Sequence, residues 1–142
     1  MATVYSSEAT GPLNTTPATF ADGGVVGAPL RRIRGTYTMA GDASGTIIVV
    51  GKLPANARFA YGVLTASATL GTATIKIGTS SSDAAYMAAA TFTTADTPTF
   101  FGKAAAVSGT APTSADNIII TTATASLPGS GTLVCDIYYS MA

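Results

Sequence analysis

The chain has 142 residues, of which only 10% are charged, and seven basic and seven acidic side chains leave it without formal net charge. This balance disfavours nucleic-acid binding, which requires clustered Lys and Arg against phosphates. The absence of histidine removes the usual general base of hydrolases, and the single cysteine excludes an intramolecular disulfide. A surface with so few charges suggests that partner subunits cover much of it.

The sequence also lacks signals for export or membrane insertion. Its apolar runs are far shorter than the roughly 18 residues that span a bilayer. The N-terminus, MATVYSSEATGPLN, has neither the basic nor the apolar region of a signal peptide. We therefore expect a protein that is made and used without export and without membrane contact.

Residues 1–28 are rich in Thr, Pro, Gly and Ala, with isolated apolar positions. This composition predicts an extended N-terminal arm ahead of a folded domain that covers residues 29–142. The arm is either a disordered tail or a segment that becomes ordered on a neighbouring subunit, with Tyr5 and Phe20 as anchors.

The first expected strand is RRIRGTYTM, in which Ile33, Tyr37 and Met39 face one way and Arg32 and Arg34 face the other. The cluster of Arg31, Arg32 and Arg34 has two interpretations. It protects an edge strand against aggregation, or it forms an interface that meets an acidic partner surface.

Further strands are expected at 45–50, 57–67, 71–79, 117–125 and 132–139, separated by turn sequences such as AGDASG, TSSSD and SLPGSG. The continuous β-branched run in Gly45–Val50 predicts a strand that is covered on both faces. In three other strands, alternation places one set of residues on a single face: Phe59, Tyr61 and Val63; Ala73, Ile75 and Ile77; Leu133, Cys135, Ile137 and Tyr139.

The segment from Ser82 to Ala90 does not fit the strand pattern. Its alanines follow a possible Ser or Asp N-cap, which predicts a short helix or an irregular loop.

Two connections indicate how the strands are arranged. Gly51–Asn56 is too long for a tight hairpin and contains Pro54, so it can carry the chain from one sheet to the facing one. Leu70-Gly71 is expected to be a tight corner between adjacent strands. Together they predict an all-β fold, a jelly-roll-like antiparallel β-sandwich with an extended N-terminal arm.

Candidates for chemistry are few. Cys135 lies at an inward position and is expected to be a core thiol rather than a nucleophile. The aspartates occur mostly in turns, where they serve local hydrogen bonds, and calcium binding by Asp42, Asp83 and Asp116 is a weaker alternative. We expect no enzyme activity, no cofactor and no metal site.

The stretch IIVVGKLPANARFAYGVLTASATLGTATIKIGTSSSDAAYM, the TPTFFG segment and the closing TLVCDIYYS strand resemble capsid decoration proteins of tailed bacteriophages, also called cement or head-stabilising proteins. The resemblance covers about residues 29–140. It implies a jelly-roll-like sandwich that binds the outside of an assembled icosahedral capsid, often as a homotrimer, and it carries no catalytic residues with it.

From this resemblance we expect a virion protein on the capsid exterior, made in the host cytoplasm, with the major capsid protein and further copies of itself as partners. The candidate interface residues are Tyr5, Phe20, Arg31, Arg32 and Arg34. The main alternative is a receptor- or carbohydrate-binding module of a phage fibre, with Tyr86, Phe100 and Phe101 as a small aromatic patch. A tail-tube, neck or major shell subunit is a further alternative.

Overall fold

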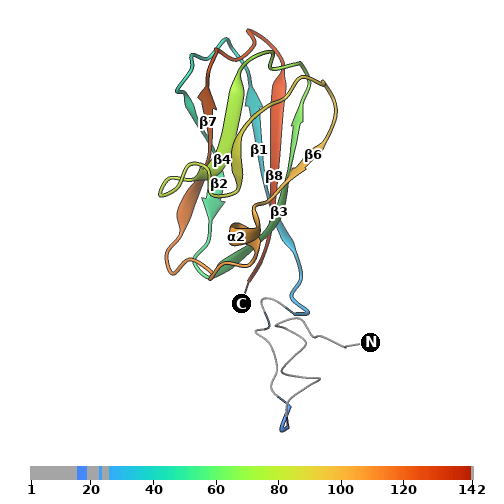
Figure 1. The fold of residues 1–142 in the computed structure, drawn as a ribbon, viewed down its shortest axis with the longest axis vertical. Helices are drawn as coiled ribbons and strands as arrows, with labels where there is room; N and C mark the ends of the chain where they lie inside the picture. Colours follow the sequence, from blue (N-terminus) through green and yellow to red (C-terminus); the bar gives the residue numbers. More distant parts are fainter. Residues whose placement is uncertain (1–15, 19–22, 24–25, 142) are drawn as a thin grey trace, which may run out of the picture.

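A computed structural model of the chain describes residues 16–18, 23 and 26–141. Within these residues, a pair of four-stranded antiparallel sheets stacks as a sandwich (Figure 1). The elements are β1 Arg31–Thr38, β2 Ile47–Leu53, β3 Ala57–Ala66, β4 Thr74–Thr79, β5 Met87–Thr91, β6 Thr99–Phe101, α2 Ala104–Val107, β7 Asp116–Ala123 and β8 Thr132–Met141. None of the described helices is long and apolar enough to cross a membrane.

The strand order identifies the sandwich as a jelly roll. One sheet has the order β1-β8-β3-β6 and the other β2-β7-β4-β5. The pairs β1–β8, β2–β7, β3–β6 and β4–β5 are those of one long folded hairpin, and rolling it up adds the pairs β3–β8 and β4–β7. The predicted jelly-roll-like sandwich is therefore confirmed. Most of residues 1–28 lies outside the described residues, so the boundary between arm and domain stays a prediction.

The connection between β2 and β3 crosses between the sheets, as predicted, but it is shorter than expected. β2 continues to Leu53, so only Pro54–Asn56 link it to β3. Asn56 adopts a positive φ of 61°, a conformation that Asn tolerates better than most residues.

The prediction for Leu70-Gly71 was wrong. β3 and β4 belong to different sheets, so this corner is a second crossing and not a hairpin. Leu70 is almost fully buried, and it closes one end of the sandwich where the chain changes sheet.

Ser82–Ala90 does not form the short helix that was one of its two predicted structures. Residues 83–86 form turns and bends, which agrees with the alternative of an irregular loop, and β5 begins at Met87. Pairing of β5 with β4 outweighs the helix propensity of the three alanines, because propensity is weaker than tertiary context.

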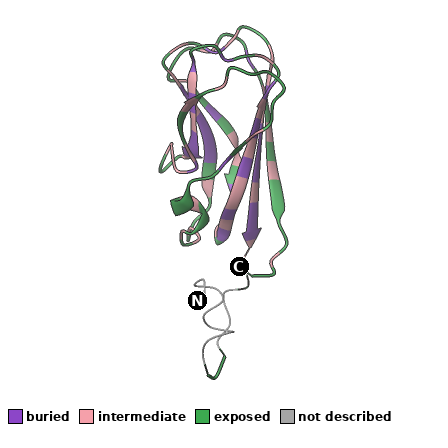
Figure 2. Cartoon of the chain, turned by 45° about the vertical axis from the view of Figure 1, so that its right-hand side comes forward, coloured by how far each residue is buried: buried purple, intermediate pink, exposed green. Residues whose placement is uncertain are grey.

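The buried residues, coloured purple in Figure 2, lie along the strands of both sheets. Their side chains form one hydrophobic core. The alternation predicted for β4 and β8 is confirmed by Ile75, Ile77, Cys135 and Ile137, each no more than 1% exposed. The expectation that β2 is covered on both faces was wrong. Ile47 and Val49 are 58% and 59% exposed, because no described layer lies on the outer side of this edge strand.

One side of the sandwich is closed by contact between the edge strands β1 and β2. A Cβ atom on Gly35 would lie 2.6 Å from Val50 Cγ1 and 2.9 Å from the carbonyl oxygen of Val50, and one on Gly51 would lie 2.6 Å from Ile33 Cγ2. Only glycine allows the two strands to come this close.

We expect Gly35→Ala to destabilise the fold by about 1–3 kcal/mol, because the added methyl group forces the strands apart. The free energy of unfolding in urea measures the effect. Gly129→Ala is the matched control, since a Cβ there meets no atom within 4 Å. Equal stability of the two variants would contradict the close approach of β1 and β2.

Candidate interaction surface

The described residues contain no group of three or more His, Cys, Asp or Glu side chains that could hold a metal ion. Cys135 is 1% exposed, and burial raises the pKa of its thiol to about 12. It is a core residue, as predicted, and at neutral pH it carries no thiolate that would act as a nucleophile.

Asp42, Asp83 and Asp116, which the sequence offered as a weaker candidate for calcium binding, each make their own local contacts. Asp42 accepts hydrogen bonds from Tyr37 Oη at 2.6 Å and the Ala40 N–H, and Asp83 pairs with Lys76. The Tyr37 hydroxyl is the main cause of a lowered pKa at Asp42. These contacts agree with the local role that the sequence predicts for aspartate in turns.

Asp116 begins β7 and fixes the 80–86 loop. Its carboxylate accepts hydrogen bonds from Ser81 Oγ at 2.7 Å and from the N–H groups of Ser81 and Asn117. The Ser81 hydroxyl is the largest cause of its lowered pKa. This carboxylate therefore anchors a loop through local bonds.

The arginine cluster lies on an edge strand, as one of its two interpretations requires. β1 is the outermost strand of its sheet, and Arg31, Arg32 and Arg34 are all exposed. Arg34 differs from its neighbours because its guanidinium binds Asp136 of β8 through two hydrogen bonds, Nε to Oδ1 at 2.7 Å and Nη2 to Oδ2 at 2.6 Å. The bidentate acidic partner expected from another protein is thus provided for Arg34 by its own chain.

The ion pair is asymmetric in exposure. The Arg34 side chain is 50% exposed, whereas that of Asp136 is 10% exposed. Hydrogen bonding to Arg34 is the main cause of the lowered pKa of Asp136, which burial opposes. The outward face of β8 consequently carries a carboxylate that stays ionised although it is largely covered.

Three aromatic side chains cross the outer face of the same sheet. Tyr61 of β3 stacks on Tyr138 of β8, with ring centroids 4.7 Å apart, and lies 6.0 Å from the ring of Phe100 on β6. Phe100 is 73% exposed, the highest value among the large apolar side chains described. We call Tyr61, Tyr138 and Phe100 the aromatic stripe.

The sequence did not reveal this stripe because a bulge in β3 reverses the alternation. The register with β8 shifts between Phe59 and Tyr61, so Phe59 is buried and Tyr61 points outward. The prediction that Phe59, Tyr61 and Val63 share one face was therefore wrong. Gly62 and Leu64 occupy the inward positions instead.

Positive charge accompanies the aromatic stripe. Register and burial place Arg32 and Arg34 on the outer face of this sheet, together with the acid Asp136. Arg58 of β3 lies beside α2 instead, where its guanidinium donates to the carbonyl oxygen of Gly109. Arg32 stands opposite Tyr138 in the pairing of β1 with β8. Aromatic residues and arginine are the types most enriched at the centres of protein interfaces. This face therefore combines exposed aromatic rings with arginine and is the candidate interaction surface of the described residues.

The aromatic patch expected for a carbohydrate site does not form from the predicted residues. Tyr86 and Phe101 are 6% and 7% exposed, and both belong to the core, where Phe59 stacks on Tyr86 at 4.2 Å. Of the three predicted residues, Phe100 alone is exposed.

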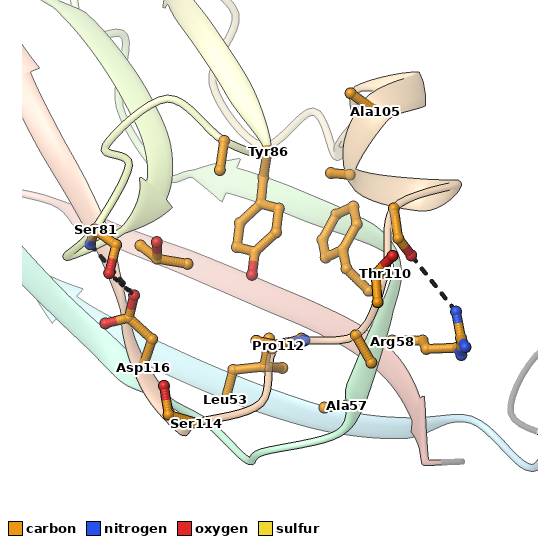
Figure 3. A pocket seen from close by; sticks show the side chains of 16 residues that line it. Leu53, Ala57, Arg58, Ser81, Tyr86, Ala105, Thr110, Pro112, Ser114 and Asp116 are labelled. Carbon is orange, nitrogen blue, oxygen red and sulfur yellow. Dashed lines mark hydrogen bonds between the residues drawn. The ribbon is translucent and has the colours of Figure 1, made fainter.

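A separate hollow of about 420 Å³ lies under α2 and the 109–114 segment (Figure 3). Leu53, Ala57 and Pro112 give it apolar walls, and the side chain of Tyr86 points into it. Burial is the main cause that raises the pKa of Tyr86 to about 12, with the charge of Asp116 adding to it. The hollow offers an apolar site with a polar rim, at which Ser81 Oγ donates to the carboxylate of Asp116.

Of the predicted interface residues, the structure places the three arginines on β1, whereas Tyr5 and Phe20 lie outside the described residues. Whether these five residues form an interface stays a prediction.

Comparison with known proteins finds no matching family model and no matching curated protein. Solved structures with the same fold do exist. A chain in the capsid asymmetric unit of cyanophage Pam1 matches with a TM-score of 0.71 at 18% identity, over 91% of this chain and 97% of that chain. A chain in the capsid of Ralstonia phage GP4 matches with a TM-score of 0.66 at 20% identity, over 80% and 85%. A chain in the acid-stable capsid of Helicobacter pylori bacteriophage KHP30 gives 0.59 at 12% identity, over 79% and 87%. At these identities the likeness establishes the fold.

We expect Asp136→Asn to lower the free energy of unfolding by about 1–2 kcal/mol near pH 7, because it leaves the Arg34 guanidinium without its carboxylate. Since the pKa of Asp136 is lowered in the folded state, this contribution is fully present above the unfolded pKa near 3.8 and is lost as pH falls through the folded value. Urea unfolding at pH 7 and at steps below pH 4 measures it. The exposed Asp96→Asn is the control, and a difference that persists unchanged at the lowest pH would contradict this account.

Proposed function

We propose that the chain is a virion structural protein of a tailed bacteriophage, which binds the outer surface of an assembled icosahedral capsid and stabilises it as a decoration or cement protein. The observation that carries the proposal is the match to a chain of the Pam1 capsid asymmetric unit, which covers 91% of this chain and 97% of that chain.

The surface described above suits such a role. A cement protein requires a rigid body and a broad contact area with the shell. The aromatic stripe and Arg32 supply apolar contact and positive charge on one face, and the neutral, charge-poor remainder allows close approach of further subunits. We propose that the outer face of the β1-β8-β3-β6 sheet meets an acidic region of the major capsid protein.

A decoration role is preferred over that of a major shell subunit because the chain has only 142 residues. The proposal includes a homotrimer on the capsid exterior, assembled from chains made in the host cytoplasm. Light scattering on the purified protein tests this aspect. A mass three times the 14.1 kDa of one chain is expected, and a monomer at working concentration would contradict it.

The exposed ring of Phe100 beside Tyr61 supports a second candidate, a receptor- or carbohydrate-binding module, because sugars stack on exposed aromatic rings. A glycan array distinguishes the two. Binding of a defined glycan would favour the receptor module, and its absence together with high copy number on particles would favour decoration.

We expect near-stoichiometric amounts of this chain relative to the major capsid protein when intact particles are purified and quantified by mass spectrometry. A handful of copies would indicate a fibre or neck protein. Absence from the particles would overturn the structural role.

We further expect Arg32→Glu and Phe100→Ser each to weaken binding to capsids that lack this protein by at least about tenfold, because truncation at the centre of an interface typically costs about 1–2 kcal/mol or more. Co-sedimentation with such capsids measures the affinity. Lys52→Glu and Val107→Ser are matched controls, since both side chains are exposed on other regions of the molecule. Equal loss in the controls would exclude this face as the capsid contact.

A further inference from the structure

The two sides of the sandwich differ in how closely their edge strands approach each other. Gly35 and Gly51 bring β1 and β2 together, whereas β5 and β6, the opposite edge strands of the two sheets, leave a groove of about 540 Å³ between them. Met87, Ala90, Phe92, Thr99 and Phe101 contribute to its walls. The groove therefore lies between two sheet edges, and no strand of the described part of the chain occupies it.

The groove is nearly free of charge. Among the described residues that line it, Lys103 is the one that carries a charge, and β5 itself consists of Met, three Ala and Thr. The other long edge strands carry charges, three Arg on β1 and Lys52 on β2. Charges on an edge discourage pairing with a further strand, so β5 is the long edge strand without protection by charged side chains.

A bulge interrupts the pairing of β5 with β4. Between the pairs Ile75–Ala90 and Ile77–Met87, two residues of β5, Ala88 and Ala89, stand opposite Lys76 alone. Both alanines are exposed. An extended segment placed here would gain backbone hydrogen bonds from β5 and apolar contact from the groove, which is recognition by strand addition.

We propose that residues 2–6 (Ala-Thr-Val-Tyr-Ser) of a second copy of this chain bind in the groove as an added strand along β5. Thr, Val and Tyr favour extended structure, no charged side chain precedes Glu8, and no proline precedes Pro12. Tyr5 provides one aromatic side chain for a groove that already contains Phe92 and Phe101.

Two features favour a second copy as the source. The arm joins β1, and β1 and β6 are the opposite edges of one sheet. The described residues just before β1 do not fold back onto the body, since Val26 and Leu30 are 55% and 52% exposed. The chain from Ser6 to Val26 can span roughly 65 Å when extended, which is enough to reach a neighbouring domain. This inference rests on the homo-oligomer that is included in the proposed function.

Disulfide trapping tests the contact directly. One preparation carries Tyr5→Cys and another carries Ala89→Cys, and the two are mixed and oxidised. Interchain product at least about fivefold above that from a mixture with Thr36→Cys, an exposed position on β1, is expected. The same yield with both partners would overturn the proposal. Cys135 is buried and is present in every sample.

A chain that carries both Tyr5→Cys and Ala89→Cys distinguishes a partner's arm from the chain's own arm. The double variant is oxidised at decreasing protein concentration. A disulfide within one chain that persists on dilution would overturn the assignment to a second copy. An interchain disulfide whose yield falls on dilution supports it.

Oligomer mass gives an independent readout. Deletion of residues 2–7 and Ala89→Arg should each raise the dissociation constant of the oligomer at least about tenfold by light scattering, whereas the exposed α2 variant Ala104→Arg should not. Unchanged association in the first two variants would overturn the inference. If association is unchanged but the chain is near-stoichiometric on particles, the arm contact is rejected and the decoration role is kept. If the variants weaken association but the chain is absent from particles, only the decoration role is rejected.

Discussion

The position of β8 between β1 and β3 is the constraint on which the rest of the structure depends. This C-terminal strand pairs with β1 along the whole of Arg31–Thr38 and with most of β3, so both ends of the described domain meet in one sheet. Its inward residues, including Leu133 and Ile137, form the middle of the core. Its outward residues hold Arg34 through Asp136 and support Tyr61 through Tyr138. One strand thus stabilises the core and orders the outer surface.

This arrangement explains how a protein with little side-chain chemistry can still have a defined surface. Arg34 and Asp136 are separated by 102 positions in the chain, and they are brought together only when the jelly roll closes. The bulge in β3 turns Tyr61 onto the same face. Bulges commonly redirect a side chain near a functional surface, and here the redirected ring completes a stripe across three strands. The proposed contact with a capsid uses a surface that exists only in the folded protein.

The two sides of the sandwich, where the edge strands of the two sheets face each other, differ in sequence. Along β1 and β2, glycines permit close contact and basic residues mark the edges. Along β5 and β6, small and uncharged residues leave a groove. Natural sheets protect edges with charge unless pairing is useful. The groove lies at the β6 edge of the sheet whose outer face is the proposed capsid contact, and Phe100 borders both surfaces.

The sequence by itself determined the fold class, the alternation in β1, β4 and β8, and the burial of Cys135, because strict period-2 patterns and turn residues act locally. It also indicated that β2 and β3 belong to different sheets. Only the tertiary structure decided the outward direction of Tyr61, the strand at Met87–Thr91, the crossing at Leu70 and the exposure of Ile47. Each of these features depends on which strands are neighbours in the folded sheets. Local sequence patterns do not reveal a bulge in one strand or the absence of a covering layer over another. The partner of Arg34 was hidden for the same reason, since strand pairing sets it across almost the whole domain.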